Sequence, residues 1–364
     1  MTGPRVQLED LGWDDSWREA LMPGTPHAED AGDGQGCPGR VVRVDRGLCT
    51  VLTMAGPVRA SLGGDVLSVM ATDPLAAPCT GDWCLVRQWP DGPLTVETLA
   101  ARRTSLVRAG AARSSHGQVM AANVDTVALV VALHPEPNLG RIERLLGVAW
   151  ESNASPLVVL TKIDQVVDGD AIAADVRVAA PGVEVVCCSA TTGQGVDAIR
   201  AMLHHGRTMV MVGASGHGKS TLTNALVGAD VLTTRAIRDD GKGRHTSVRR
   251  ELLVVPGGGA IIDTPGLRGV GLQRDEVALR QTFPDIDPLT EHCRFRDCHH
   301  ETEPGCAITA ALAAGELSVR RWESWQKLNR ELAWAERRTD ARLRAEQAKR
   351  WRDITKQTRG RGRR

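Results

Sequence analysis

Short alternating apolar and polar runs fill residues 37–104, and turn signals separate one run from the next. Strand-like segments of this length and spacing are typical of a small β-barrel. The predicted strands cover residues 40–44, 48–54, 58–62, 82–89 and 93–99. About five strands fit an OB-type barrel, although the pattern alone does not separate it from an SH3-like barrel.

From about residue 126 the pattern changes, because longer apolar runs alternate with helical segments. Continuous apolar strands joined by helices favour a mostly parallel sheet that is covered on both faces. The runs cover residues 126–133, 156–164, 183–190, 208–216 and 259–266. We therefore predict a multi-domain α/β protein whose second domain spans residues 105–272.

The two ends of the chain lack these strand patterns. Residues 1–36 are acidic and rich in Gly and Pro near their end, so we predict a flexible extension with room for one short helix at residues 13–21. Residues 273–335 begin as a loop rich in Cys and His and then become helical. A long charged helix is predicted from about residue 310 to 351, and residues 336–364 form a basic helical or disordered tail.

Composition agrees with a soluble globular protein, since 42% of the residues are hydrophobic and 24% are charged. No apolar run is long enough to cross a membrane, and the N-terminus lacks the apolar stretch of a signal peptide. We therefore expect a cytoplasmic protein without membrane contact. In that compartment the nine cysteines are better explained as thiols or metal ligands than as disulfides.

The net charge of +1 conceals an uneven distribution. Residues 320–364 contain 16 Lys and Arg but only 6 Asp and Glu, so the rest of the chain is acidic. A basic tail on an acidic body suggests a polyanionic partner such as RNA. The interspersed acidic residues leave a merely solvated helix open as the alternative, and the Trp residues of this region fit helix packing better than base stacking.

The segment Gly213–Thr221 reads GASGHGKST and fits the pattern G-x-x-x-x-G-K-[ST] between a strand and a helix. Glycines let backbone N–H groups converge on phosphate oxygens, and the following helix adds its positive end. Lys219 reaches the β- and γ-phosphates, and Ser220 ligates Mg²⁺. The alternative is a Gly-rich turn that binds nothing. The predicted phosphate-binding residues are Gly213, Ala214, Ser215, Gly216, His217, Gly218, Lys219, Ser220 and Thr221.

A second motif predicts which base the nucleotide carries. The predicted base-binding residues are Thr161, Lys162, Ile163 and Asp164, which follow an apolar strand, and Ser189 and Ala190, which end the next one. The Asp164 carboxylate accepts hydrogen bonds from guanine, whereas adenine has no donors at those positions. Alone, this tetrapeptide could also be a strand-end turn with a helix cap. A P-loop ATPase is disfavoured by Asp164.

Two further segments predict a γ-phosphate sensor. Asp263 and Gly266 belong to a D-x-x-G turn, which places the carboxylate near Mg²⁺ and the Gly N–H near the γ-phosphate. The Gly- and charge-rich loop 241–247 contains Thr246, a predicted Mg²⁺ ligand and catalytic-site residue with Lys219. In each case a simple turn or loop is the alternative.

Residue 267 is Leu, where many GTPases place a Gln that orients the attacking water. Leu cannot hydrogen-bond, so we expect slow hydrolysis unless another group assists. His245 is the candidate catalytic residue, and a packing or partner contact is an equally reasonable role for it.

The order of these motifs differs from that of the usual GTPase chain. The base-reading motif precedes the P-loop, the switch loop and the D-x-x-G turn, so the domain is circularly permuted. Downstream, a Cys-x₄-Cys-x-His-x₅-Cys pattern offers three thiolates and one imidazole, a set suited to one structural Zn²⁺. Its predicted ligands are Cys293, Cys298, His300 and Cys306.

With the permuted order, the preceding barrel and the following zinc pattern, the chain closely resembles the RsgA (YjeQ/YloQ) family over about residues 37–330. The resemblance implies an OB domain, a permuted GTPase domain, a zinc-binding domain, and GTP hydrolysis stimulated by the small ribosomal subunit during its late maturation. Two positions depart from the family pattern: Thr161 replaces a commoner Asn that braces the P-loop, and His217 replaces a small aliphatic residue.

The leading hypothesis is therefore an enzyme that hydrolyses GTP to GDP and phosphate on the small ribosomal subunit, binds its rRNA and acts as a monomer. Mg²⁺ accompanies the nucleotide, and one structural Zn²⁺ is expected. The alternative is a non-catalytic assembly factor that binds RNA and senses GTP or GDP without useful turnover.

Overall fold

The computed structural model describes residues 7–23, 36–90, 92–108, 117–204, 206–228, 250–264 and 276–334. The chain divides into two compact units, residues 1–270 and 271–364, and each is described by itself. The predicted switch loop 241–247, Gly266, Leu267 and the tail 336–364 lie outside the described residues.

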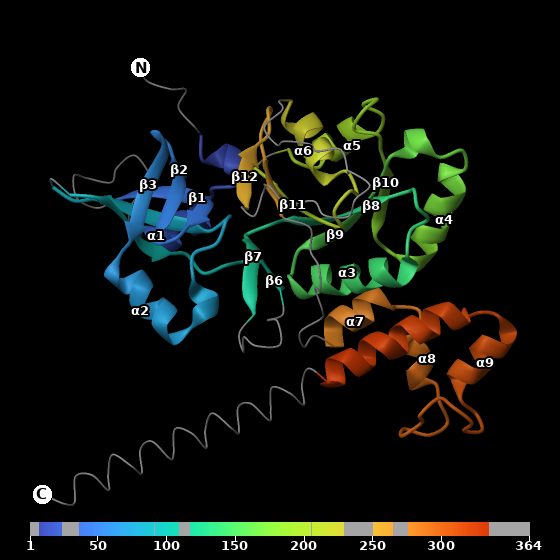
Figure 1. Cartoon of the computed structure of the whole chain (residues 1–364). Coiled ribbons are helices and arrows are strands. Elements are labelled where there is room, and N and C mark those ends of the chain that lie inside the picture. Colours follow the sequence, from blue (N-terminus) through green and yellow to red (C-terminus); the bar gives the residue numbers. More distant parts are fainter. Residues whose placement is uncertain are drawn as a thin grey trace, which may run out of the picture. The chain divides into compact units, whose positions relative to one another are not determined.

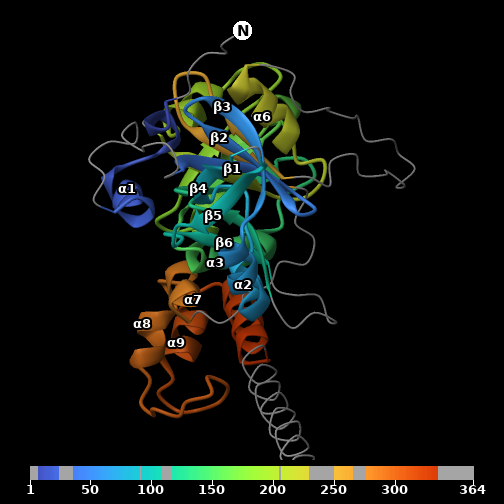
Figure 2. The same ribbon diagram turned by 90° about the vertical axis from the view of Figure 1, so that its left-hand side faces the viewer.

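A closed five-stranded barrel begins the first unit (Figures 1 and 2). Its strands are β1 (Cys37–Asp45), β2 (Leu48–Thr53), β3 (Gly56–Leu62), β4 (Trp83–Gln88) and β5 (Leu94–Leu99). The strand order is β1-β2-β3-β5-β4, and β4 closes the barrel by pairing with β1. Between β3 and β4 lie α2 (Gly64–Thr72) and the short 3₁₀ helix η3 (Pro74–Ala76). This architecture confirms the predicted OB-type barrel.

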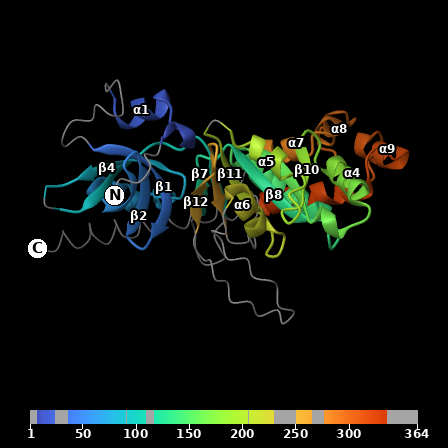
Figure 3. The same cartoon turned by 90° about the horizontal axis from the view of Figure 1, so that it is seen from above.

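Residues 7–23 are folded, so the short helix predicted at residues 13–21 is present, whereas the predicted flexible extension is wrong for the residues just before it. The folded segment forms the 3₁₀ turn η1 (Glu9–Leu11) and α1 (Asp15–Leu21), and α1 lies beside β4 (Figure 3). The Trp13 ring meets Trp83 of the barrel edge-on at 5.1 Å. The apolar side chains of this acidic segment recur at helical spacing and are buried, whereas its acidic side chains remain exposed.

A six-stranded sheet forms the rest of the first unit, in the order β10-β9-β8-β11-β13-β12. Its strands are β8 (Thr126–Ala132), β9 (Ser155–Thr161), β10 (Glu184–Cys187), β11 (Thr208–Val212), β12 (Glu251–Val254) and β13 (Ala260–Asp263). In this sheet five strands are parallel, and the edge strand β12 pairs antiparallel with β13. A separate two-stranded ribbon, β6 (Ser105–Arg108) and β7 (Gln118–Ala122), leads into the sheet.

Helices cover both faces of this sheet, as expected for buried parallel strands (Figure 1). On one face α5 (Val196–Ala201) and α6 (Lys219–Val227) share an apolar core with alternate residues of β8, β9, β11 and β13. On the other face α3 (Leu139–Glu151) packs on β8 and β9, with α4 (Gly169–Ala179) beside it. Parallel pairing brings the carboxyl ends of β8, β9, β11 and β13 to one edge.

The described part of the second unit consists of helices joined by loops: α7 (Glu276–Thr282), α8 (Asp287–Glu291), α9 (Ala307–Ala314) and a helix over residues 319–334. Phe283 and Ile308 are fully buried in its core. Arg321 lies over the Phe283 ring and pairs with Asp285 at 2.6 Å. No described helix in either unit is long and apolar enough to cross a membrane.

Candidate nucleotide and metal sites

The glycine-rich turn after β11 has the backbone of a phosphate-binding loop. Gly213 packs so closely on β8 that a Cβ there would lie 2.3 Å from the Val130 carbonyl oxygen. Gly218, with φ of 85°, is the N-cap of α6 and directly precedes its first residue, Lys219. The Lys219 ammonium donates to the carbonyls of Gly213 and Ala214 at 3.1 and 2.9 Å. The Lys219 amino group therefore lies against the backbone of the predicted phosphate-binding loop.

The base-reading turn and the phosphate loop are joined by a direct hydrogen bond. The Thr161 hydroxyl, at the end of β9, donates to the carbonyl of His217 at 2.7 Å. The predicted loss of bracing at this position is therefore wrong, because a hydroxyl makes the contact that the replaced amide was expected to make. The next residue, Lys162, turns the chain in a left-handed conformation with φ of 63°.

His217, to which the sequence assigned no individual role, gives the phosphate loop a second anchor. Its Nδ1 lies 3.2 Å from the carbonyl oxygen of Val130 on β8. Burial, together with the nearby charges of Arg141 and Lys219, lowers the pKa of the ring, so the neutral form is favoured. No local sequence signal predicts this contact, because it depends on β8 and β11 being neighbours.

Asp263 ends β13 beside the phosphate loop and is 7% exposed. Its Oδ1 is buried and has no hydrogen-bond partner among the described residues. Burial raises the pKa of this carboxyl to about 6, against the opposing effect of the Lys219 charge. A buried, unsatisfied carboxylate oxygen beside the P-loop fits a divalent cation, since hard oxygen ligands are what Mg²⁺ prefers. Ser220, in the first turn of α6, adds a hydroxyl on the same motif.

The remaining predicted base-binding residues lie at the ends of β9 and β10. The Ile163 N–H donates to the Cys188 carbonyl at 3.3 Å, which ties the β9 turn to the turn after β10. Ser189 is fully buried, and its hydroxyl lies 2.9 Å from that of Thr191. Asp164 is exposed and therefore accessible to a ligand. The sheet edge thus gathers the predicted residues from both motifs, whereas His245, Thr246 and Gly266 lie outside the described residues.

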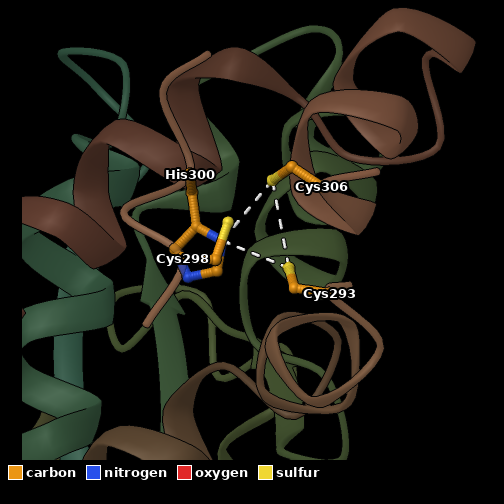
Figure 4. A group of neighbouring side chains, drawn as sticks. All are labelled: Cys293, Cys298, His300 and Cys306. Carbon is orange, nitrogen blue, oxygen red and sulfur yellow. Dashed lines mark hydrogen bonds between the residues drawn. The ribbon is translucent and has the colours of Figure 1, made fainter. Parts of the chain in front are cut away.

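The four predicted metal ligands of the second unit converge on one point (Figure 4). Their ligand atoms all lie within 4.8 Å of one another. The Sγ atoms of Cys293 and Cys306 are 3.9 Å apart, and both lie within 3.5 Å of His300 Nδ1. Sulfur atoms bound tetrahedrally at zinc distances lie roughly 3.8 Å apart. The cluster, which Cys298 completes, therefore fits a single tetrahedral metal ion.

Local elements explain this convergence. Cys293 follows α8, Cys298 and His300 lie in the connecting loop, and Cys306 is the N-cap of α9. His300 adopts a left-handed backbone with φ of 62° and meets the Trp322 ring edge-on at 5.6 Å. Neither His292 nor His299 belongs to the cluster, as their register in the sequence predicts.

Comparisons with known proteins agree with this architecture. A sequence model described as the RsgA GTPase matches residues 99–273. The "Small ribosomal subunit biogenesis GTPase RsgA" of Streptomyces coelicolor is 51% identical over 93% of this chain and 90% of its own length. The chain belongs to the RsgA GTPase family. Both the predicted family and the predicted enzyme class, a GTP hydrolase, are thereby confirmed.

Other RsgA relatives and solved structures extend the match. "Small ribosomal subunit biogenesis GTPase RsgA 2" of Lactiplantibacillus plantarum is 41% identical over 81% of this chain and 83% of its own length. The crystal structure of YjeQ from Thermotoga maritima superposes with a TM-score of 0.61 at 26% identity, covering 81% of this chain and 98% of that one. The structure of YloQ, titled a circularly permuted GTPase, shares the fold with a TM-score of 0.56 over 81% of this chain and 94% of that one at 24% identity.

Proposed function

We propose that this GTPase binds the small ribosomal subunit and hydrolyses GTP to GDP and phosphate during late maturation of that subunit. The observation that carries the proposal is the high identity, along nearly the full chain, to proteins named for small-subunit biogenesis. The strand-end edge supports the nucleotide part, because it gathers a phosphate loop, a base-reading turn and a buried carboxylate. A cytoplasmic location follows from this role.

Within the nucleotide site, we assign guanine recognition to Thr161–Asp164 with Ser189 and Ala190, and phosphate binding to Gly213–Thr221. Lys219 exchanges its present carbonyl partners for phosphate oxygens, which carry full negative charge and accept more strongly. Mg²⁺, when bound, neutralises phosphate charge, and Ser220, Thr246 and Asp263 are its proposed protein partners. Gly266 is the proposed γ-phosphate contact.

Slow intrinsic hydrolysis follows from Leu267, since no glutamine is available there to orient water. We propose that His245 supplies this function when the ribosomal partner is bound. The alternative, a nucleotide sensor without turnover, predicts that His245→Ala has no effect on rate. Under either reading, Lys219→Ala abolishes nucleotide binding because the phosphates lose their fixed cation.

For the cluster of Cys293, Cys298, His300 and Cys306 we propose one structural Zn²⁺. The proposal rests on three thiols and an imidazole, which are ligands that zinc prefers, and on four protein ligands, which leave no open position for catalysis. Metal analysis of the purified chain should give one zinc per molecule, and none for Cys298→Ala. The control Cys187→Ala lies outside the cluster and should retain the metal. Zinc retained in full by Cys298→Ala would contradict this ligand assignment.

RNA binding by the barrel is supported by its outer surface. Strand register places Arg43 and Arg59 opposite Thr50, on the side away from the apolar core. At the β4–β5 turn the Trp89 ring is 39% exposed, and the Arg87 guanidinium lies over it at 4.2 Å. Arginine beside an exposed aromatic ring suits phosphate contact and base stacking in one place.

Sedimentation with purified small ribosomal subunits tests the binding proposal. We expect the full chain to co-sediment when loaded with a non-hydrolysable GTP analogue and to dissociate when loaded with GDP, because nucleotide state alters the switch segments. Lys219→Ala should co-sediment to the same extent with the GTP analogue and with GDP. Equal sedimentation of the wild-type protein with GTP analogue, with GDP and without nucleotide would contradict nucleotide-controlled binding.

A further inference from the structure

A cavity of about 550 Å³ opens on the barrel where α2 and η3 approach the end of β5. In Figures 1 and 2, α2 lies at the lower end of the barrel, below its strands. The cavity walls are largely apolar, and Val66, Val69, Leu75 and Leu99 contribute their side chains. None of the predicted nucleotide-binding residues or metal ligands belongs to its lining, and none of the functions assigned above uses it.

One face of α2 lines this cavity. Asp65, Val69 and Asp73 follow one another at helical spacing of four residues, and all three belong to the lining. Leu67 lies on the same helix but does not line the cavity. Val69 and Leu67 are nevertheless equally exposed, at 52% and 51%. The helix therefore offers two comparable apolar side chains, of which one faces the cavity.

The charged groups of the lining are unbalanced. Asp65, Asp73 and Glu97 are acidic, whereas Arg102 alone is basic among the described lining residues. Arg102 is already committed, because its guanidinium donates to both carboxylate oxygens of the buried Asp82 at 2.7 and 2.8 Å. It also donates to the Leu75 and Ala77 carbonyls.

The three lining carboxylates retain acceptor capacity for a ligand. Asp73 accepts one backbone N–H, from Leu75, and Glu97 accepts the Thr95 hydroxyl. Each carboxylate offers about four lone-pair sites, so these bonds leave most of them open. A cationic donor that reaches the cavity rim therefore meets unsatisfied acceptors.

We propose that this cavity is a docking site for a lysine- or arginine-bearing peptide segment of a partner protein. One aliphatic side chain of that segment enters between α2 and β5, and flanking cations meet the three carboxylates. A largely apolar lining with an excess of carboxylates favours an occupant that combines apolar bulk with positive charge. RNA is the less suitable occupant, because its phosphates meet carboxylates here. The site does not depend on GTP turnover.

Fluorescence anisotropy with the full chain tests this docking site. The probe is a fluorescein-labelled peptide of lysines with a single central leucine, and its counterparts carry a central serine or replace every lysine with glutamate. We expect saturable binding of the leucine peptide and at least about tenfold weaker binding of the serine peptide, since the apolar contact is lost. The glutamate peptide should not bind.

Matched variants locate the binding. Val69→Arg should weaken the leucine peptide at least about tenfold, because it adds a cation and removes an apolar wall. Leu67→Arg, equally exposed on the same helix, should leave its affinity unchanged. Asp65→Asn should weaken it several-fold, whereas Asp168→Asn, at an exposed carboxylate before α4, should not. Retained circular dichroism and melting temperature show that the variants are folded.

Three results overturn the proposal. The first is no saturable binding of the leucine peptide by the wild-type chain, and the second is equal loss in Val69→Arg and Leu67→Arg. The third is that Val69→Arg and Asp65→Asn leave the peptide unaffected but tighten binding of single-stranded oligouridylate, which identifies RNA as the occupant. GTP turnover is measured in parallel, and an intact rate beside any of these results leaves the proposed function standing.

Discussion

A single hydroxyl links the two halves of the nucleotide site at the residue scale. Thr161 ends the strand that carries the base-reading turn, and it holds the tip of the phosphate loop through the His217 carbonyl. The imidazole of His217 holds the same tip against β8. The loop is thus fixed from two neighbouring strands, which lowers the ordering cost of nucleotide binding.

Removing this hydroxyl should weaken nucleotide binding. We expect Thr161→Val to reduce GTP and GDP affinity by roughly 2- to 12-fold, the worth of one net hydrogen bond. Thr161→Ser keeps the donor and should bind normally. Titration with a fluorescent GTP analogue measures both affinities, and identical values for the Val and Ser variants would show that the bond contributes nothing.

Burial of the Asp263 carboxylate lowers the stability of the ligand-free protein at neutral pH. An unfolded Asp titrates near 3.8, whereas burial raises the folded pKa to about 6. Between these pH values the folded chain holds the extra proton, so stability falls as the pH rises through this window. Above pH 6 the cost is complete, at about 3 kcal/mol. A bound cation would offset it by satisfying the carboxylate.

Asp263→Asn should therefore stabilise the metal- and nucleotide-free protein at pH 7.5, by up to about 3 kcal/mol, and change little near pH 4. The same variant should bind Mg²⁺ and GTP more weakly. Asp164→Asn, at an exposed carboxylate, is the control for the substitution itself. Urea unfolding at the two pH values measures the effect, and lower stability of Asp263→Asn at pH 7.5 would contradict this account.

At the scale of elements, hydrogen bonds from a buried arginine join the barrel to the sheet. Arg40 on β1 is 1% exposed and donates to the Thr208 hydroxyl of β11 and the Asn123 carbonyl at 2.7 and 2.8 Å. It also donates to the Leu11 carbonyl of the N-terminal segment. Burial lowers its pKa to about 10, against the favourable charges of Asp125 and Asp82, so the guanidinium stays protonated.

Arg40→Met should cost about 3 kcal/mol or more, because several buried acceptors lose their donor together. Arg43→Met, on the same strand with a partly buried pair to Asp45, removes one hydrogen-bonded ion pair and should cost about 1 kcal/mol or less. Urea unfolding followed by tryptophan fluorescence compares the two. Similar losses for both variants would mean that the Arg40 contacts do not fasten the barrel.

Periodicity predicts the elements that bury a regular face. The five barrel strands and the five parallel strands are visible in the sequence because alternating or continuous apolar runs mark them. The sequence pattern does not reveal the edge strand β12, the β6–β7 ribbon or α2. These segments are short and pack against few neighbouring elements, so their apolar pattern is weak. No local pattern marks Arg40 as buried, because its partners lie 29, 83 and 168 residues away in the sequence.

The sequence likewise predicts only part of the candidate site. Motif spacing predicts the phosphate loop and the four metal ligands, because their residues are close in sequence and fixed by chemistry. The Thr161–His217 bond and the raised pKa of Asp263 depend on which strands become neighbours. They emerge only once the sheet order β9-β8-β11-β13 is known. The folded segment 7–23 is likewise explained by tertiary contacts with the barrel.

At the scale of the whole molecule, the permuted order places the unit with the candidate metal cluster directly after the D-x-x-G motif in the chain. The base-reading turn comes earlier, on β9, and reaches the phosphate loop through space. The proposed γ-phosphate contact is therefore close in sequence to the second unit, and Arg40 joins the barrel to β11, whose end carries the phosphate loop. This arrangement suits an enzyme whose turnover depends on a bound partner.

The rate of phosphate release from GTP measures whether the small ribosomal subunit activates the proposed hydrolysis. With Leu267 in place of glutamine, we predict slow turnover by the chain alone and at least about tenfold faster turnover when purified small subunits are added. Large subunits serve as the control. A rate unchanged by small subunits, or raised equally by large ones, would contradict the account.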